Sequence, residues 1–244
     1  MTWSDDDALW EMTEPAMFTS ERIANAPQEV DHLIELLRIK PPARVLDMCT
    51  GPGRHAIELA KRGFAVTGVD RTARYLERAR IDAAEARVEV ELIRGDARNF
   101  TREGAFDAAL CLFTSFGFFD DEDNRTVLRN LAASLRPGGA AIIDVNGKEV
   151  LARRFQPRSW SEGGGVFILE DRKIRSDWSH VDARWIVFRD GVRRDFDITV
   201  RVYSGLELKS ELLQCGFERV NLYGALTGAE YDVDAQRLIA IARR

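Results

Sequence analysis

The stretch from Arg44 to Gly63 constrains the fold of this chain most strongly, because three different elements follow one another within it. Val45–Met48 is an apolar run that predicts a short strand, and His55–Arg62 carries apolar residues at helical spacing. Gly51 and Gly53 lie between them and allow a sharp turn with close approach of a ligand. Free N–H groups at the start of the helix point into the same space. A strand, a glycine loop and a helix in this order predict an α/β nucleotide site.

The charge of Asp47 indicates which nucleotide this loop binds. Gly51, Gly53 and Ala56 satisfy the dinucleotide pattern G-x-G-x-x-G/A, and Asp70 follows about 20 residues later. That pattern alone is weak. A carboxylate at the end of the first strand would repel a pyrophosphate, whereas it would favour a ligand that carries an ammonium and a sulfonium. S-adenosylmethionine carries both groups, so it is the expected cofactor.

Four motifs in the first part of the chain resemble the class I S-adenosylmethionine-dependent methyltransferases. They are Asp47-x-x-x-Gly51-x-Gly53, Gly68-Val69-Asp70, Gly95-Asp96-Ala97 and Leu135-Arg136-Pro137-Gly138-Gly139. The resemblance is strong over about residues 30–145 and looser beyond. It implies an α/β fold, with a Rossmann-like seven-stranded mixed sheet whose last strand is antiparallel, flanked by helices. The implied activity is that of a transferase, an S-adenosylmethionine-dependent methyltransferase (EC 2.1.1.-).

The resemblance also assigns a cofactor site. Asp70 would accept hydrogen bonds from both ribose hydroxyls while capping the following helix. Asp96 would bind the adenine amino group, although a plain surface turn at Gly95–Ala97 is the alternative. Cys49 stands where the family usually has glycine, a departure that is similar to some bacterial members. The expected cofactor-binding residues are Asp47, Cys49, Gly51, Gly53, Asp70, Arg71, Asp96, Ala97 and Phe113.

Composition favours one α/β domain with an inserted cap. The chain has 244 residues and a net charge of −5, which argues against a nucleic-acid partner with its usual need for a basic face. The three isolated cysteines fit neither a disulfide framework nor a metal site, so no metal is expected. Since no signal peptide or bilayer-spanning run is recognisable, we expect a cytoplasmic protein with no membrane partner, as a monomer or homodimer. The basic cluster at Arg153, Arg154 and Arg158 is interpreted as solvated surface.

The first 27 residues interleave acidic and aromatic side chains, with no basic residue before Arg22. Aromatic residues argue that this segment docks on the fold rather than frays. One interpretation is a lid that closes over the cofactor and acceptor and excludes water, with Trp10 and Phe18 among its contacts. The other is that its tryptophans only pack on the domain surface. Both remain open on sequence grounds.

The segment after the predicted fourth strand, 106–113, bears on the acceptor. Family members that methylate nucleic-acid bases or protein glutamine usually have an Asn or Asp, two prolines and an aromatic residue here, whereas this chain has Thr114–Phe119. The difference favours a small-molecule acceptor. Phe113 and Thr114 are expected at the sulfonium, and Phe116 and Phe118 in the acceptor pocket or, alternatively, in the core.

Residues 163–203 change from helical spacing to alternation, with a hairpin signal at Asp190-Gly191. We expect an antiparallel insertion that covers the acceptor site, as in the family's sugar N-methyltransferases and glycine N-methyltransferase relatives. The expected division is a lid at 1–27, a core at 28–147 and 204–244, and a cap at 148–203. The face of the hairpin that lines the pocket is not determined.

Candidates for acceptor binding and catalysis come from these segments. Arginines among aromatic side chains suit an anionic or planar acceptor. The expected acceptor-binding residues are Trp10, Phe18, Phe116, Asn146, Trp178, Arg184, Arg201 and Tyr203. No general base is evident, and the weak candidates are His55, Tyr203 and Asp144; for His55 a packing role is the favoured alternative.

The sequence predicts methylation of a small-molecule acceptor, at nitrogen or oxygen rather than carbon. A protein that binds the cofactor without methylating is one alternative. An NAD(P)-dependent dehydrogenase would use the same glycines, but Asp47, the Gly95–Ala97 turn and the antiparallel last strand speak against it.

Overall fold

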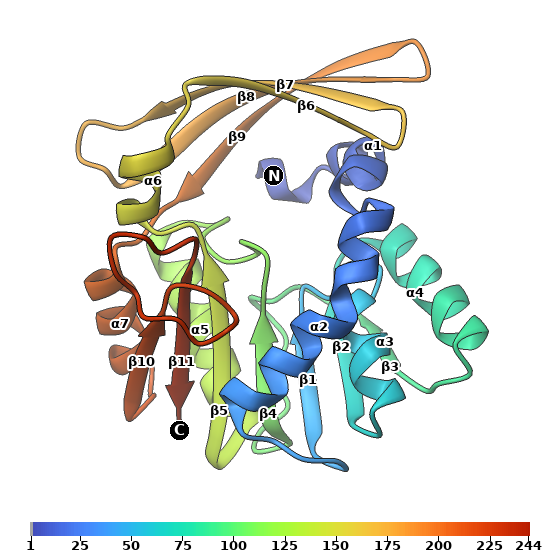
Figure 1. Cartoon of the computed structure of the whole chain (residues 1–244), viewed down its shortest axis with the longest axis vertical. Coiled ribbons are helices and arrows are strands. Elements are labelled where there is room, and N and C mark those ends of the chain that lie inside the picture. Colours follow the sequence, from blue (N-terminus) through green and yellow to red (C-terminus); the bar gives the residue numbers. More distant parts are fainter. Residues whose placement is uncertain (1) are drawn as a thin grey trace.

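The computed structural model describes residues 2–244 and has two β-sheets. The strands of the larger sheet are β1 (Arg44–Met48), β2 (Ala65–Asp70), β3 (Glu91–Arg94), β4 (Phe106–Cys111), β5 (Leu135–Val145), β10 (Arg219–Tyr223) and β11 (Leu238–Arg243). Their order is β10-β11-β5-β4-β1-β2-β3. All neighbours are parallel except β11, which is antiparallel to both β5 and β10. The predicted seven-stranded mixed sheet with an antiparallel last strand is therefore confirmed (Figure 1).

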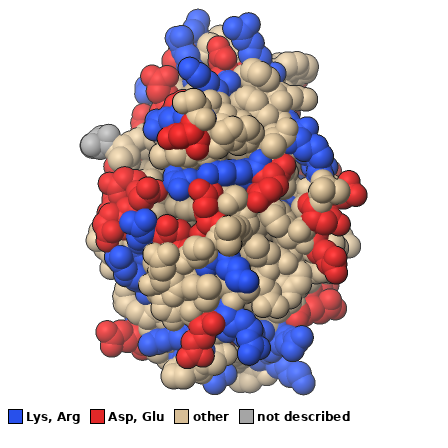
Figure 2. Space-filling view, turned by 90° about the vertical axis from the view of Figure 1, so that its left-hand side faces the viewer, with Lys and Arg blue, Asp and Glu red and all other residues tan. Residues whose placement is uncertain are grey.

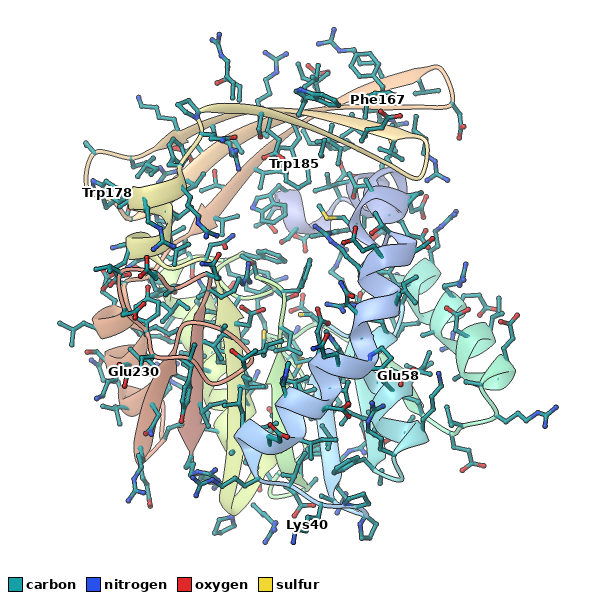
Figure 3. All side chains as sticks on the ribbon, viewed as in Figure 1. Lys40, Glu58, Phe167, Trp178, Trp185 and Glu230 are labelled. Carbon is teal, nitrogen blue, oxygen red and sulfur yellow. The ribbon has the colours of Figure 1, made fainter. Side chains whose placement is uncertain are left out.

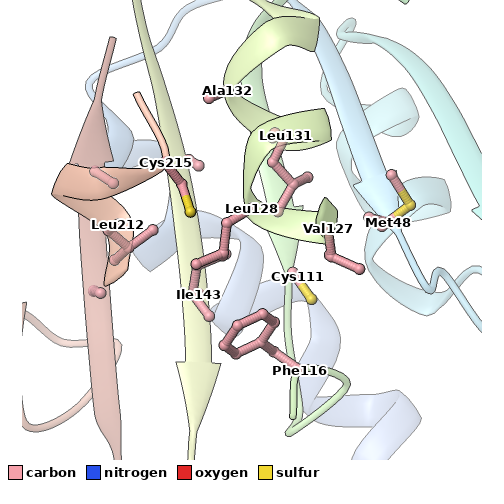
Figure 4. Close-up of a cluster of buried hydrophobic side chains, with 14 of the residues drawn as sticks. Met48, Cys111, Phe116, Val127, Leu128, Leu131, Ala132, Ile143, Leu212 and Cys215 are labelled. Atoms are coloured by element: carbon pink, nitrogen blue, oxygen red, sulfur yellow. The ribbon is translucent and has the colours of Figure 1, made fainter. Parts of the chain in front are cut away.

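Helices cover both faces of this sheet. They are α2 (Ser20–Leu37), α3 (Arg54–Lys61), α4 (Ala73–Glu85), α5 (Asp121–Ser134) and α7 (Gly205–Gln214). Apolar residues of α2 and α3 pack with β1, β4 and β5 on one face. On the other face, α5 and α7 pack against the same central strands, and Figure 4 shows Leu128 and Leu131 of α5 beside Ile143 of β5 and Leu212 of α7. The central strands are thus buried on both faces, as parallel strands usually are.

Local sequence signals explain where most helices begin. Asp120 caps α5 by accepting a hydrogen bond from the Asp123 backbone N–H at 2.8 Å. Ser204 and Glu207 form a capping box at α7. In the sequence, Val30, Leu33 and Leu37 at helical spacing predict a helix only over Glu29–Arg38. In the structure, α2 begins at Ser20, capped by Thr19, and passes through Pro27. The first half of α2 matters because it brings Arg22 to the site described below.

The second sheet is antiparallel and separate. Its strands are β6 (Arg158–Gly163), β7 (Val166–Ile174), β8 (His180–Arg189) and β9 (Val192–Arg201), in that order. The predicted hairpin at Asp190-Gly191 is confirmed, and both residues have positive φ, as a tight primed turn requires. The sequence reading missed β6 and the short helix α6 (Lys148–Arg154), since serines and charges in β6 give no clear alternation.

The N-terminal segment lies between the two sheets (Figure 1). It consists of the 3-10 turn η1 (Trp3–Asp5) and helix α1 (Asp7–Met17). Leu9 packs into an apolar cluster with Val166, Val187 and Phe196 of the second sheet, and Trp3 donates its indole N–H to the Thr199 carbonyl at 2.7 Å. The first residues therefore form part of the packed fold.

The surface carries charges of both signs. On the face shown in Figure 2, Lys and Arg side chains are interspersed with Asp and Glu side chains. None of the helices within residues 2–244 combines the length and apolar character needed to cross a membrane.

Candidate cofactor and acceptor site

A cavity of about 490 Å³ lies at the carboxyl ends of the central strands, between the two sheets. Its walls come from the loops after β1, β2, β3 and β4, from the N-terminal segment, and from one face of the second sheet. Ligands of open α/β sheets bind at this edge, and volumes of roughly 300–1,000 Å³ are usual for small-molecule sites. The cavity is therefore the candidate functional site.

Two buried carboxylates organise the glycine loop. Asp47, at the end of β1, accepts a hydrogen bond from the Thr50 hydroxyl at 2.7 Å. Asp70, at the end of β2, accepts backbone N–H bonds from Gly51 and Thr72, each at 2.8 Å. Burial raises the pKa of both carboxyl groups, even though these hydrogen bonds act in the opposite direction. Burial disfavours the charged form of a carboxyl group, so two buried acids at this edge of the sheet indicate a binding role.

The Phe18 ring approaches the backbone of the loop closely at Gly51. Gly51 has φ of +58°, a conformation that favours glycine, and a Cβ there would lie 3.0 Å from the Phe18 ring. Phe18 itself packs edge-on against Tyr75 of α4, with ring centroids 5.3 Å apart. The loop is thus covered by the end of the N-terminal segment.

Glu29 of α2 holds the first turn of α3 in place. Its carboxylate accepts hydrogen bonds from Nε2 of His55, at 2.7 Å, and from Arg54. Burial acts to raise the pKa of Glu29, but the hydrogen bond from His55 and the charge of Arg54 outweigh it, and the pKa is lowered. His55 is therefore oriented by an anionic partner while it lines the cavity.

Three guanidinium groups surround the ring of Phe113, which is 43% exposed. The Cζ atoms of Arg22, Arg54 and Arg237 lie 4.8, 5.0 and 6.0 Å from the ring centroid. All three arginines line the cavity. They come from α2, α3 and the segment before β11, so sequence reasoning missed them. An anionic ligand group would be drawn to this cluster, since guanidinium groups bind carboxylates in a fixed geometry.

Arg237 is fixed by neighbours on adjacent strand ends. It donates to Asp144 at 2.7 Å, to the Asn146 side chain at 2.9 Å and to the Thr114 hydroxyl at 2.8 Å. Phe113 and Thr114 both have positive φ, near +60°. Such strained backbone in non-glycine residues is concentrated at functional sites.

The acid expected at the adenine end has an arginine partner. Asp96 accepts hydrogen bonds from the Arg98 backbone N–H at 2.8 Å and from its guanidinium at 2.7 Å, and the side-chain hydrogen bond from Arg98 lowers the pKa of Asp96. Arg98 also lies 3.5 Å from Asp5 of the N-terminal segment.

Comparison with known proteins shows what this chain is similar to. Residues 45–139 match the family described as "Methyltransferase domain". A glycine/sarcosine N-methyltransferase from Halorhodospira halochloris is 27% identical over 240 residues, which cover 91% of this chain and 82% of that protein. This chain therefore carries a methyltransferase domain and resembles the class I S-adenosylmethionine-dependent methyltransferases. Two further glycine/sarcosine N-methyltransferases align at 34% and 36% identity, over less than half of their own length.

Solved structures share the fold of this methyltransferase. CcbJ from Streptomyces caelestis superimposes with a TM-score of 0.79 and 19% identity, covering 100% of this chain and 98% of that chain. The amino pentose methyltransferase CalS10 from Micromonospora echinaspora, solved with S-adenosylmethionine bound, gives 0.65 and 23%, covering 97% and 96%. The match of residues 45–139 to a methyltransferase domain supports S-adenosylmethionine as the cofactor.

The N-terminal segment of the methyltransferase is hydrogen-bonded to Arg71, in the loop after β2. Arg71, next to Asp70, donates to the carbonyls of Ser4 and Asp5 at 2.8 and 3.0 Å. Arg71 also lies 3.2 Å from Asp7. These contacts hold the segment in the wall of the cavity.

Most residues expected at the cofactor and acceptor sites line this one cavity. Of the expected cofactor residues, those in its wall are Asp47, Cys49, Gly51, Asp70, Arg71, Asp96, Ala97 and Phe113; of the acceptor residues, Trp10, Phe18, Phe116, Asn146 and Arg201; of the catalytic candidates, His55. The cavity therefore joins segments that are far apart in the chain.

Five expected residues lie outside the wall of the cavity. Gly53 is the N-cap of α3 in a left-handed conformation, and a Cβ there would lie 3.0 Å from the Cβ of Ala79. Asp144 is buried against Arg237, and Tyr203 is buried and stacks on Phe116 at 5.3 Å.

The other two expected residues outside the cavity wall are Trp178 and Arg184. Trp178 lies in the turn between β7 and β8 and is 40% exposed. Arg184 points to the outer face of the second sheet, where it pairs with Asp195 at 2.6 Å. The alternation of β8 puts Trp185 on the inner face instead, and Figure 3 shows Trp185 beneath the sheet and Phe167 above it. The face of the hairpin that lines the pocket, which the sequence left undetermined, is therefore the face that carries Trp185.

Within residues 2–244, no group of three or more His, Cys, Asp or Glu side chains is close enough to hold a metal ion. Cys49 has φ of +59°, so it takes the left-handed conformation that glycine would adopt in its place.

Proposed function

We propose that this methyltransferase moves the methyl group of S-adenosylmethionine to the nitrogen of a small amine. The observation that carries the proposal is the single cavity shared by the glycine loop and the inner face of the second sheet. Donor and acceptor held together there would meet in line, and alignment of this kind supplies much of the rate of a displacement reaction. The N-methyltransferase names of the relatives support nitrogen as the acceptor atom.

The residues present fit the chemistry of the cofactor. The carboxylate of Asp70 has lone pairs left for the ribose hydroxyls, and that of Asp96 for the adenine amino group. The methionine carboxylate would bind to Arg22, Arg54 and Arg237. S-adenosylmethionine supplies a methyl group already activated by the positive sulfur. The negative charge of Asp47 would attract the positively charged groups of the cofactor.

The lining favours an amine over a hydroxyl acceptor. A neutral amine attacks with its own lone pair, whereas an alcohol has to lose a proton to a base in the site. Among the lining residues that the structure describes, His55 is hydrogen-bonded to Glu29, Asp47 and Asp70 are held by the loop, and Glu170 is paired with Arg172. We therefore assign none of them as a general base.

The division of the chain forms part of this proposal. Residues 1–27 act as the lid, 28–147 and 204–244 as the methyltransferase core, and 148–203 as the cap over the acceptor. A small molecule rather than a nucleic acid is the partner, and the cytoplasm is the place of action.

The test is methyl transfer to a panel of paired amines and alcohols of equal carbon skeleton. Mass spectrometry would detect a gain of one methyl group, about 14 Da, only in the amines and only with S-adenosylmethionine. Methylation of the alcohols with the amines left unchanged would contradict the proposal.

A further inference from the structure

Two charged residues on the cavity face of the second sheet take no part in the cofactor site. Glu170 and Arg172 lie on β7, and both line the cavity. Nη1 of Arg172 is 3.3 Å from Oε2 of Glu170, and Nη2 donates to the Ser159 hydroxyl at 2.9 Å. The two side chains thus form a partly neutralised pair above the acceptor space.

This pair has unused hydrogen-bonding capacity. Nε of Arg172 is buried and has no partner within residues 2–244. Among the described residues, Arg172 is also the one polar side chain that contacts the Glu170 carboxylate. Buried polar groups in proteins are usually satisfied, so an unpartnered donor beside an under-used carboxylate indicates a ligand position.

The surroundings of the pair are apolar. In the strand register, Trp185 lies opposite Glu170 and Ala183 opposite Arg172, and both of them line the cavity. The Phe155 ring centroid is 6.0 Å from Cζ of Arg172. Burial raises the pKa of Glu170, and the charge of Arg172 opposes this only in part. The pair therefore lies in a region that would contact a hydrophobic ligand body.

Charge decides what kind of group suits the pair. A ligand carboxylate would be attracted by Arg172 but repelled by Glu170 a few ångströms away, and an ammonium would meet the reverse. An uncharged group that both donates and accepts satisfies the carboxylate and the guanidinium together without a buried net charge. A hydroxyl or a carboxamide is such a group.

We propose that Glu170 and Arg172 form a specificity site for the far end of the acceptor. A hydroxyl or carboxamide there donates to Glu170 and accepts from the Arg172 guanidinium. This inference rests on the proposed function, and it makes the acceptor an amine with an apolar body and an uncharged polar group at its other end. Glycine itself has no apolar body and carries a carboxylate at its other end, so it does not match this description.

The test measures binding of four matched ring amines to the protein saturated with S-adenosylhomocysteine. They are trans-4-aminocyclohexanol, cyclohexylamine, trans-4-aminocyclohexanecarboxylate and trans-1,4-diaminocyclohexane. We expect the alcohol to bind at least about tenfold more tightly than each of the others, the scale for pairing a hydroxyl with a charged partner. Tightest binding of a charged analogue, or no binding of any of the four, would overturn the proposal.

Variants separate the pair from the rest of the site. Arg172→Met and Glu170→Gln should remove the preference for the alcohol over cyclohexylamine. Arg172→Lys keeps the charge without the directed Nε–H, so it should lose the preference as well. Arg184→Met, on the outer face, is the matched control and should retain it. A preference that survives in Arg172→Met and Arg172→Lys would refute the assignment.

Binding of S-adenosylhomocysteine alone, followed by calorimetry, keeps the two proposals distinguishable. We expect the same affinity in all these variants, because neither residue belongs to the cofactor loops. If the wild-type protein bound no S-adenosylhomocysteine, the proposed function would fail; normal cofactor binding without alcohol preference would refute the specificity site alone.

Discussion

Arg71, which follows Asp70 in the chain, should control closure of the N-terminal segment. Arg71→Met removes two hydrogen bonds to backbone carbonyls, at 2.8 and 3.0 Å, and the ion pair with Asp7. Hydrogen bonds from charged groups contribute about 1.5–3 kcal/mol each when buried. Since the Arg71 side chain is 31% exposed, we discount both for solvent screening and expect about 2 kcal/mol in total. That value corresponds to roughly a 30-fold increase in the opening equilibrium of the segment.

Hydrogen exchange of the α1 backbone amides measures this opening directly. We expect their protection to fall roughly 30-fold in Arg71→Met, while the amides of β1 and β4 keep theirs. Arg74→Met is the matched control, since its ion pair with Glu14 is 52% exposed at the arginine and should change protection by far less. Equal losses in both variants would refute the role of Arg71.

Closure and cofactor binding should also be coupled. Because Arg71 follows Asp70 directly, S-adenosylhomocysteine should increase the protection of α1, and Arg71→Met should weaken cofactor binding. Protection of α1 that does not respond to the cofactor in the wild-type protein would contradict the coupling.

Three further predictions concern the cofactor site. Asp47→Asn should raise the melting temperature of the ligand-free protein. Folding raises the pKa of Asp47, so the contribution of this group to the free energy of unfolding is complete below the unfolded pKa, near 3.8. That contribution is lost as the pH rises through the folded pKa. A lower melting temperature at pH 7 would contradict this. Arg237→Met should weaken S-adenosylhomocysteine binding by about 1.5–3 kcal/mol, as titration calorimetry can check, and unchanged affinity would exclude the carboxylate assignment. Cofactor affinity should fall as acidification protonates Asp70, whose pKa burial raises; an affinity that is flat from pH 7 to pH 4 would speak against the ribose contact.

The sequence predicted the parts of the fold that local patterns determine. The strand, loop and helix around Gly51 and the hairpin at Asp190-Gly191 depend on glycine conformation and apolar periodicity, which are visible in neighbouring residues. The half of α2 before Glu29 was missed because Pro27 interrupts the pattern, although tertiary packing carries the helix through it.

Parts of the site that depend on long-range packing could not be predicted. Arg22, Arg54 and Arg237 meet around Phe113 only after the sheet has formed. Arg184 and Trp185 are neighbours in sequence, and only the register of β8 decides that Trp185 faces the cavity. A shift of one residue in that register would exchange the two faces, so no local signal could settle it.

The central claim is that the buried carboxylate at the end of β1 favours a positively charged sulfur compound over a diphosphate. Titration calorimetry of the wild-type protein and Asp47→Asn with S-adenosylmethionine, S-adenosylhomocysteine and NAD tests it most directly. We expect the wild-type protein to bind the first two and not NAD. The variant should lose affinity for S-adenosylmethionine more than for S-adenosylhomocysteine, whose sulfur carries no charge. Binding of NAD by the wild-type protein, or equal losses for the two sulfur compounds in the variant, would contradict the claim.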